Sequence, residues 1–400
     1  MRLVTRRTTR TILMVEKPRA TRRGAPERAV VVGAGPAGLA VAGALAQRGV
    51  VPLVLDSAEN VASSWRGRYD RLRLNTPRWL AGLPGARLPR FVGRWPSRED
   101  YLCFLESYAR AHVPRLEHGV LVERVERVDG GWLLATSHGE VRAAAVVIAT
   151  GYDRVPVVPD WPGRDSFRGE LFHSADYREP SPFVGRDVLV VGAGTSGNEI
   201  AVRLAEGGAR RVRVAVRSRP WLVPRDWHGV PLPAVVYAGR RTPRLLDAAA
   251  PLLDRLLWGD LEKLGLPAPA EGPTTLVART GHGNSSDSGL IAAIRSGRIE
   301  VLTAVTALQD DDVVLADQRR IQPEILIAAT GYRCGLEPLI GHIPGVLRPD
   351  GRPAITGPTT SPAAPGLHTI GFRNPVSGQL PELRADARAI VQAITTRIRA

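Results

Sequence analysis

Short apolar runs alternate along the chain with longer segments in which apolar residues recur at helical spacing. Residues 29–32 form one such run and residues 188–191, in a strand expected over 187–191, form another, and each is followed by a glycine-rich turn and a helical pattern. Uninterrupted apolar runs of this length are typical of strands buried on both faces of a parallel sheet. The repeated order of strand, turn and helix predicts an α/β fold with two Rossmann-like dinucleotide-binding domains.

The first turn has the spacing GxGxxG, with Gly33, Gly35 and Gly38 as its glycines. In such a turn the first glycine makes the bend, the second lets the backbone approach a pyrophosphate, and the third lets the helix pack closely on the strand. Asp56 ends the next apolar run, where a carboxylate accepts a hydrogen bond from a ribose 2′-hydroxyl. The first unit therefore predicts a bound adenine dinucleotide.

The second turn repeats this spacing at Gly192, Gly194 and Gly197, but the next expected strand, residues 212–216, is followed by Arg217. A guanidinium pairs with a 2′-phosphate, which a carboxylate would repel, so the second unit predicts NADPH over NADH. Two alternatives stay open. Arg217 is one of many arginines in the chain, and glycine turns also occur in α/β proteins that bind no nucleotide.

The segment just before the second turn carries a longer motif. Phe167, Gly169, His173 and Tyr177 fit the pattern FxGxxxHxxxY, which resembles the identifying motif of flavin-containing monooxygenases. Further segments shared with that family are WRGRYDRLRLNTP at 65–77, ATGY at 149–152 and 329–332, and GDLEKLGLPAPAEGP at 259–273. The last of these is most similar to the YUCCA-type branch. Tyr177 and Arg178 stand where the Baeyer–Villiger relatives have Trp followed by Pro or Asp, which argues against that branch.

This resemblance implies an NADPH- and FAD-dependent monooxygenase that inserts one oxygen atom from O2 into a small organic substrate through a C4a-(hydro)peroxyflavin. The outcome would be N- or S-oxygenation, or oxidative decarboxylation of a 2-oxo acid. The cofactor carries the oxygen chemistry, while the protein supplies geometry, electrostatics and exclusion of water. The first alternative is an FAD/NADPH-dependent reductase or dehydrogenase without oxygen insertion. The second is a binding protein that senses nucleotides.

Two residues are the catalytic candidates. In the family, an asparagine in the place of Asn75 lies near the reactive edge of the flavin, where its amide hydrogen-bonds the peroxyflavin or the nicotinamide ribose. The sequence Asn-Thr-Pro is also a turn former, and both roles are compatible. For His173 we expect either direct proton transfer or a structural role that ties the linker to bound NADP.

The resemblance also implies where the cofactors lie. Val125, in a β-meander expected over residues 120–141, would contact the adenine. The backbone N–H groups of Gln379 and Leu380, which precede a helix expected over residues 381–398, would stabilise negative charge on reduced flavin together with the helix dipole. The predicted cofactor-binding residues are Gly33, Gly35, Pro36, Ala37, Gly38, Asp56, Ser57, Ser64, Trp65, Asn75, Thr76, Val125, Thr150, Gly151, Gly192, Gly194, Thr195, Ser196, Gly197, Arg217, Tyr332, Gln379 and Leu380.

The expected domain organisation follows from the order of these motifs. An FAD-binding domain is discontinuous, comprises residues 29–158 and 321–400, and contains the β-meander. An NADPH-binding domain comprises residues 159–320 and carries an insertion at 221–275 that is rich in Pro and Trp. Residues 1–28 read as a disordered Arg-rich leader. The loop 281–289 departs from the pattern of the YUCCA-type sequences, so the substrate is left open.

Composition narrows the remaining choices. The chain has 400 residues and a formal charge of +15, but Lys17 and Lys263 are its only lysines and the arginines are scattered, so we expect no nucleic-acid partner. Cys103 and Cys334 are too far apart in sequence for a redox pair, which disfavours disulfide reductases. No metal site and no membrane span are expected. These features suggest a cytoplasmic enzyme and leave a homodimer open.

Overall fold

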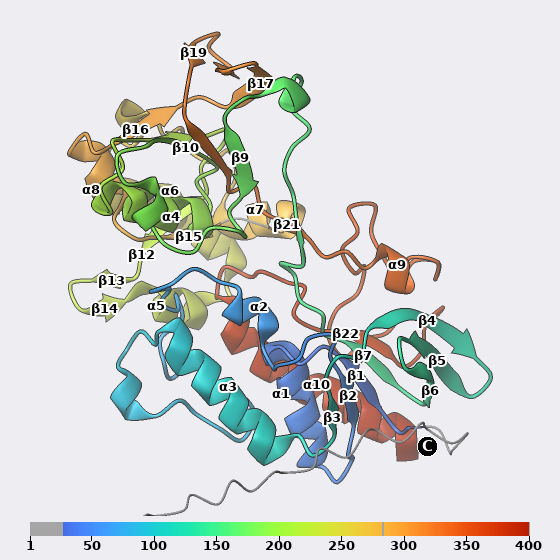
Figure 1. The fold of residues 1–400 in the computed structure, drawn as a ribbon. Helices are drawn as coiled ribbons and strands as arrows, with labels where there is room; N and C mark the ends of the chain where they lie inside the picture. Colours follow the sequence, from blue (N-terminus) through green and yellow to red (C-terminus); the bar gives the residue numbers. More distant parts are fainter. Residues whose placement is uncertain (1–26, 282–283, 400) are drawn as a thin grey trace, which may run out of the picture.

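Two parallel sheets, one in each lobe of the molecule, are built around the two glycine turns (Figure 1). The computed structural model describes residues 27–281 and 284–399. The expected leader, residues 1–28, lies almost entirely outside the described residues. Each sheet has five strands, as two Rossmann-like domains require.

The first sheet has the strand order β22-β7-β1-β2-β3, and all four pairings are parallel. Its strands are β1 (Val30–Val32), β2 (Leu53–Leu55), β3 (Leu116–Glu117), β7 (Val146–Ile148) and β22 (Leu367–Thr369). Helices α1 (Pro36–Ala46), α3 (Arg98–His112) and α10 (Gln379–Arg399) cover one face. The predicted meander, β4 (Val122–Val128), β5 (Gly131–Thr136) and β6 (Gly139–Ala143), covers the other.

Strand β1 shows why this sheet reads as an unbroken apolar run. Successive side chains of a strand point to opposite faces, so Val31 packs among the helices while Val30 and Val32 pack against the meander. All three valines are buried. Helix α3 begins after Ser97, because the Ser97 side chain accepts a hydrogen bond from the Asp100 backbone and the Asp100 side chain accepts one from the Ser97 backbone in a capping box.

The second sheet has the order β16-β11-β10-β20-β9, again all parallel. Its strands are β9 (Glu170–His173), β10 (Asp187–Val191), β11 (Arg211–Ala215), β16 (Ile299–Leu302) and β20 (Ile325–Ala328). Helices α4 (Thr195–Glu206) and α8 (Leu290–Arg295) cover one face. The other face packs against β17 (Val305–Gln309), β18 (Asp312–Leu315) and β19 (Arg320–Ile321).

The predicted boundary at residue 321 is wrong. Strand β20 pairs with β10 and β9, so the chain stays in the second domain through Ala328. A short apolar run fits either parallel sheet equally well, and its sequence does not say which sheet it joins. The chain crosses between the lobes twice, where β8 (Val155–Pro156) pairs antiparallel with β21 (Tyr332–Arg333). Helix α9 (Glu337–Ile340) follows the second crossing.

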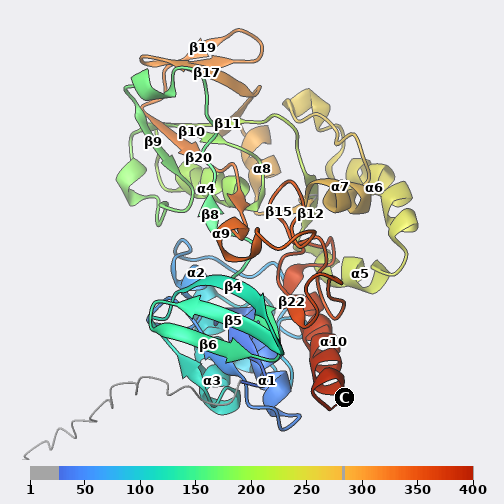
Figure 2. The same ribbon diagram turned by 90° about the vertical axis from the view of Figure 1, so that its right-hand side faces the viewer.

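The insertion forms a group of short elements beside the second domain (Figure 2). These are β12 (Trp221–Pro224), β13 (Asp226–Trp227), β14 (Val230–Pro231), α5 (Leu232–Gly239), α6 (Pro243–Trp258), α7 (Pro273–Thr280) and β15 (Asn284–Asp287). Helix α6 ends at Trp258, because Gly259 takes a positive φ of 68°. Within residues 27–281 and 284–399, no helix combines the length and the apolar character needed to cross a membrane.

Candidate active site between the two domains

A cavity of about 710 Å³ opens at the carboxyl ends of the first sheet's strands and is closed from the other side by the second domain. Gly33 follows β1, Asp56 follows β2 and Thr150 lies just beyond β7, and all three line it. Ligands of open parallel sheets bind at this edge, where the strands end. A volume of this size falls in the range of small-molecule and cofactor sites.

Most of the predicted cofactor-binding residues meet in this one cavity. The residues that line it are Gly33, Gly35, Pro36, Ala37, Asp56, Ser57, Ser64, Trp65, Asn75, Thr76, Thr150, Gly151, Thr195, Ser196, Gln379 and Leu380. Gln379 and Leu380 lie at the N-terminus of α10, so the dipole of this helix points its positive end toward the cavity. The candidates that do not line it are Gly38, Val125, His173, Gly192, Gly194, Gly197, Arg217 and Tyr332.

The first glycine turn has the construction that its spacing predicts. Gly33 has a φ of 108°, and a β-carbon there would lie 2.6 Å from the carbonyl oxygen of Ala149. A β-carbon on Gly35 would meet nothing within 4 Å, so this position faces open space that a diphosphate can fill. Gly38 lies against Gly33, which lets α1 pack closely on β1.

The second turn repeats this construction in the second domain. Gly192 has a φ of 111° and lies against Ala329, while Gly194 faces open space. A β-carbon on Gly197 would lie 2.0 Å from the carbonyl oxygen of Gly192. The first two residues of α4, Thr195 and Ser196, then line the cavity. The anion-binding N-terminus of this helix is therefore directed at the same space.

Polar groups at the edge of the first sheet fit a dinucleotide. The Asp56 carboxylate is oriented by the backbone N–H groups of Ala34 at 2.5 Å and Ala58 at 2.8 Å. Thr150 lines the cavity with a buried hydroxyl oxygen that has no hydrogen-bond partner among the described residues. Because a buried hydroxyl without a partner is costly, it indicates a polar ligand group at this point. This edge of the first sheet thus has a carboxylate and a hydroxyl group beside an open glycine turn. These groups fit the ribose and the diphosphate of an FAD molecule.

The adenine contact expected of Val125 is not supported. The Val125 side chain is fully buried between β4 and the first sheet, where it packs with Trp132 and Leu134. The cavity is instead lined by the start of the meander, residues 120–122. Val125 misses the cavity because of its position along β4. The first residue of this strand lines the cavity, and Val125 lies three residues further along.

The structure gives no support to a catalytic role for His173, because both ring nitrogens contact backbone and the residue does not line the cavity. Nδ1 accepts from the Ala175 backbone N–H at 3.0 Å, and Nε2 lies 3.0 Å from the Gly331 carbonyl oxygen. This pairing requires the neutral tautomer with the proton on Nε2. Burial lowers the pKa of the imidazole, which favours the same neutral form. His173 therefore fastens the motif before the second turn to the second crossing between the domains.

Tyr332 also lies outside the cavity. Its ring packs edge-on against His173, with 4.9 Å between the ring centroids, and the guanidinium of Arg68 lies 5.4 Å from its centroid. Tyr332 was predicted to bind a cofactor, but Tyr152, in the first copy of the ATGY motif, is the one that lines the cavity. The two copies of the motif therefore differ in position: the first reaches the cavity and the second braces the crossing.

Arg217 is exposed directly after β11, and its guanidinium forms no hydrogen bond or ion pair with the residues that the structure describes. Its strand adjoins the second turn, where the Gly192 backbone N–H bonds the carbonyl of Ala215 at 2.9 Å. Arg219, two residues on, is buried in an ion pair with Asp254 and is not free to bind a ligand. The 2′-phosphate contact of Arg217 stays a prediction.

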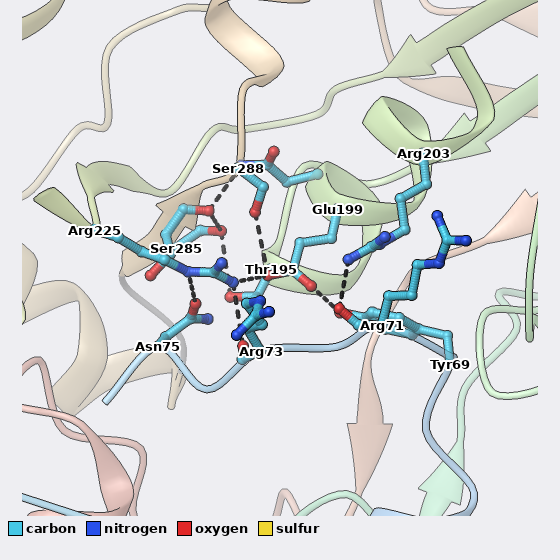
Figure 3. Close-up of polar contacts among 12 residues, drawn as sticks. Tyr69, Arg71, Arg73, Asn75, Thr195, Glu199, Arg203, Arg225, Ser285 and Ser288 are labelled. Carbon is cyan, nitrogen blue, oxygen red and sulfur yellow. Dashed lines mark hydrogen bonds and ion pairs between the residues drawn. The ribbon is translucent and has the colours of Figure 1, made fainter. Parts of the chain in front are cut away.

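A polar network that the motifs did not reveal crosses the cavity wall (Figure 3). Glu199 of α4 accepts hydrogen bonds from the Tyr69 hydroxyl at 2.5 Å, from Arg225 at 2.6 Å and from Ser288 at 3.1 Å. Arg225 in turn donates to the Asn75 side chain at 2.7 Å. The only signal in the sequence is a charged residue among the buried positions of α4, and this does not identify its partners.

Comparison with known proteins decides the family. Residues 30–228 match a family model described as pyridine nucleotide-disulphide oxidoreductase. The chain is 34% identical over 350 residues to indole-3-pyruvate monooxygenase YUCCA1 of Oryza sativa subsp. japonica, with 86% of each chain covered. It is 33% identical to the probable indole-3-pyruvate monooxygenase YUCCA4 of Arabidopsis thaliana, covering 87% of this chain and 86% of the relative. The chain belongs to the YUCCA-type flavin-containing monooxygenases.

The fold of this monooxygenase agrees with that assignment. A flavin-containing monooxygenase from Stenotrophomonas maltophilia has a similar structure, with a TM-score of 0.70 at 21% identity over 92% of this chain and 98% of the other. The predicted family, the two-domain fold and flavin-dependent oxygen insertion are confirmed. Its cofactors are FAD and NADPH, and the reductase alternative is not favoured.

Proposed function

We propose that this monooxygenase acts on a 2-oxo acid and converts it by oxidative decarboxylation. The observation that carries the proposal is the similarity over 86% of the chain to a relative named for indole-3-pyruvate, which is a 2-oxo acid. One oxygen atom of O2 is added at C2 of the substrate, the bond between C1 and C2 breaks, and C1 leaves as CO2. The other oxygen atom takes two electrons from NADPH and two protons and becomes water.

The first domain would hold FAD through Gly35, Asp56 and Thr150, where the glycine turn, the carboxylate and the unpartnered hydroxyl lie. Bound FAD, once reduced by NADPH, supplies the activation of oxygen. Gln379 and Leu380, at the positive end of the α10 dipole, would stabilise negative charge on the reduced ring. Asn75 would present its amide N–H groups to the oxygen atom that is being transferred.

The second domain would hold NADPH at the N-terminus of α4. Gly194 leaves room for the diphosphate, and Thr195 and Ser196 follow it at the cavity wall. Arg217 would pair with the 2′-phosphate, since its guanidinium is exposed and unengaged at the end of β11. This arrangement would place the two cofactors on opposite walls of one cavity, where the bound cofactors would themselves exclude water from the reacting atoms.

Two arginines of the cavity lining would bind the carboxylate of an anionic substrate. Arg73 and Arg154 line the cavity, and their guanidinium groups bond only backbone carbonyl oxygens, of Trp95 and Gly335, among the described residues. Their charges are therefore not neutralised by a carboxylate. Ser285 and Ser286 add a polar wall from β15. We infer that this wall, which departs from the family pattern, selects the side chain of the 2-oxo acid.

The test is a substrate panel. Indole-3-pyruvate, phenylpyruvate and an aliphatic 2-oxo acid are compared with a thioether, a tertiary amine and the 2-hydroxy analogue of each acid. We expect one CO2 for each NADPH oxidised with at least one 2-oxo acid and none with the 2-hydroxy acids. The proposal fails if every 2-oxo acid yields only hydrogen peroxide while the amine or the thioether is oxygenated.

We also propose that the enzyme works in the cytoplasm. What supports this is that Cys103 and Cys334 are both free thiols, one exposed and one buried, as is usual in a reducing compartment. Fractionation of the native cells with an antibody to this chain tests the location, and recovery with secreted proteins would contradict it.

A further inference from the structure

The side chain of Asn75 is held in one orientation by a residue of the insertion. The Nε–H group of Arg225 donates to Oδ1 of Asn75 at 2.7 Å (Figure 3). A guanidinium has only donors, so the atom that it meets must be the carbonyl oxygen of the amide. The Nδ2 group of Asn75, with its two N–H donors, therefore points away from Arg225. Asn75 itself lines the cavity.

Arg225 is in turn fixed by a buried carboxylate of the second domain. Its Nη2 group donates to Glu199 Oε1 at 2.6 Å and to the backbone oxygen of Arg73 at 3.2 Å. The exposed fraction of the side chain is 3% for Glu199 and 22% for Arg225. A charge this deeply buried must be paired and hydrogen-bonded, and removing its partner is costly. The ion pair thus determines where the guanidinium lies.

The remaining bonds of Glu199 tie this pair to both domains. Tyr69, from the first domain, donates to Oε2 at 2.5 Å, and Ser288, from the second, donates to Oε1 at 3.1 Å. Burial, together with the neighbouring carboxylate, raises the pKa of Tyr69 well above its usual value. The phenol therefore keeps its proton and remains a donor. Glu199, Arg225 and Asn75 form a continuous chain from α4, at the NADPH side, to the flavin side.

We propose that Arg225 is a positioning residue for oxygen transfer: it aims the amide N–H groups of Asn75 into the cavity, and Glu199 holds it in place. Arg225 does not line the cavity, so it acts through Asn75. The inference rests on the role proposed above for Asn75. When the amide is free to rotate, Oδ1 faces the transferred oxygen part of the time, and electrons from NADPH leave as hydrogen peroxide.

The first arm of the test measures hydrogen peroxide formed for each NADPH oxidised. Arg225→Lys keeps the positive charge beside Glu199. A single ammonium group, however, cannot donate to Glu199 and to Asn75 at the same time, as the separate N–H groups of the guanidinium do. We expect the product formed per NADPH to fall about tenfold, which is less than the roughly 100- to 1,000-fold loss when an oriented donor is removed outright, while the KM for NADPH changes little. Glu199→Gln should show the same loss, because its neutral amide no longer anchors Arg225.

The matched control is Arg94→Ala. Arg94 joins the first domain to the β13–β14 hairpin, which directly follows Arg225. It donates to Asp226 at 2.7 Å and to the Gly229 carbonyl oxygen at 2.9 Å. It forms no hydrogen bond with Asn75 or Glu199 among the described residues. We expect its product yield per NADPH to match the wild type. If Arg94→Ala loses as much product as Arg225→Lys, docking of the insertion alone explains the effect and the positioning role is overturned.

The second arm needs no substrate. The chain has five asparagines, so the side-chain amide signals of ¹⁵N-asparagine-labelled holoenzyme are few, and Asn75→Ala assigns the one of interest. We expect the Asn75 amide signals to shift and to exchange faster with solvent in Arg225→Lys but not in Arg94→Ala. Unchanged signals overturn the inference. A shift in the signals with no 2-oxo acid turned over by the wild type would sustain the inference and reject only the proposed substrate.

Discussion

Gly38 lies directly over the carbonyl oxygen of Gly33, so that a β-carbon on Gly38 would come within 1.8 Å of that oxygen. Between them, Gly35 faces open space with nothing within 4 Å. The three glycines of one motif therefore serve different ends. Gly33 and Gly38 allow the chain to pack on itself, whereas Gly35 leaves the space that a cofactor fills.

This difference predicts two distinct phenotypes. Gly35→Ala should lose FAD while the apoprotein keeps its melting temperature, because the added methyl group enters the ligand space alone. Gly38→Ala should destabilise the protein itself by several kcal/mol, since a backbone overlap cannot relax without moving α1 from β1. Thermal unfolding of apoprotein and flavin absorbance of purified holoenzyme separate the two. Full flavin occupancy in Gly35→Ala would show that Gly35 does not make room for the cofactor.

Local sequence patterns were sufficient to predict the two-domain fold. The apolar runs that became β1 and β10 are buried on both faces and followed by glycine turns, which leaves few other arrangements. The sequence could not assign β20 to a sheet, because strand pairing is a long-range choice and both sheets accept the same apolar run. The capping box before α3 joins two residues within one turn, so a pattern of this kind can be recognised from local sequence.

Arg217 offers a test of cofactor choice. Arg217→Ala should raise the KM for NADPH roughly 10- to 100-fold, the loss of one charge-assisted contact to a phosphate, and leave the KM for NADH nearly unchanged. Arg211→Ala is the control, since Arg211 is also exposed but begins the same strand at its opposite end. Steady-state kinetics with both nucleotides measure the effect. Equal increases for NADPH and NADH would rule out the phosphate contact.

His173 predicts a pH dependence of stability. Burial lowers the pKa of its imidazole below the ordinary value of 6.5, so the unfolded state takes up a proton before the folded state does. The free energy of unfolding should therefore be fully retained above about pH 6.5 and fall as the pH drops below it, by at most about 1.4 kcal/mol per pH unit for one proton.

The variant His173→Asn keeps an acceptor for the Ala175 N–H group but cannot titrate. Denaturant titrations at several pH values between 5 and 7.5 should show a shallower decline than in the wild type, at lower overall stability. His368 is also buried and its pKa is also lowered, so part of the slope remains in both proteins. Identical slopes would show that His173 contributes no linkage.

The ion pair between Arg219 and Asp254 should anchor the insertion on the second domain. The side chains are only 2% and 12% exposed, and their two hydrogen bonds measure 3.1 and 2.6 Å. Asp254→Ala should cost about 3–5 kcal/mol, because it leaves a buried guanidinium unpaired. The double variant Arg219→Met with Asp254→Leu should recover most of that loss. Glu126→Ala, which breaks an exposed pair with Arg124, should change stability little.

The active site was less visible in the sequence than the fold. Residues next to a strand end or a glycine turn, such as Asp56 and Thr195, were placed correctly because the parallel sheet fixes where they go. Glu199 and Arg225 were missed because their pairing joins α4 to an insertion with no motif. The sequence left the role of His173 open, because a polar motif does not reveal that both ring nitrogens contact backbone.

The most direct measurement of oxygen insertion uses ¹⁸O₂. The holoenzyme is given NADPH, ¹⁸O₂ and the 2-oxo acid that supports the highest rate, and the acid product is analysed by mass spectrometry. We expect one ¹⁸O atom in each molecule of carboxylic acid formed and one NADPH oxidised for each CO2 released. NADPH oxidation with no ¹⁸O in any organic product would contradict oxygen insertion and would indicate a flavin-dependent reductase.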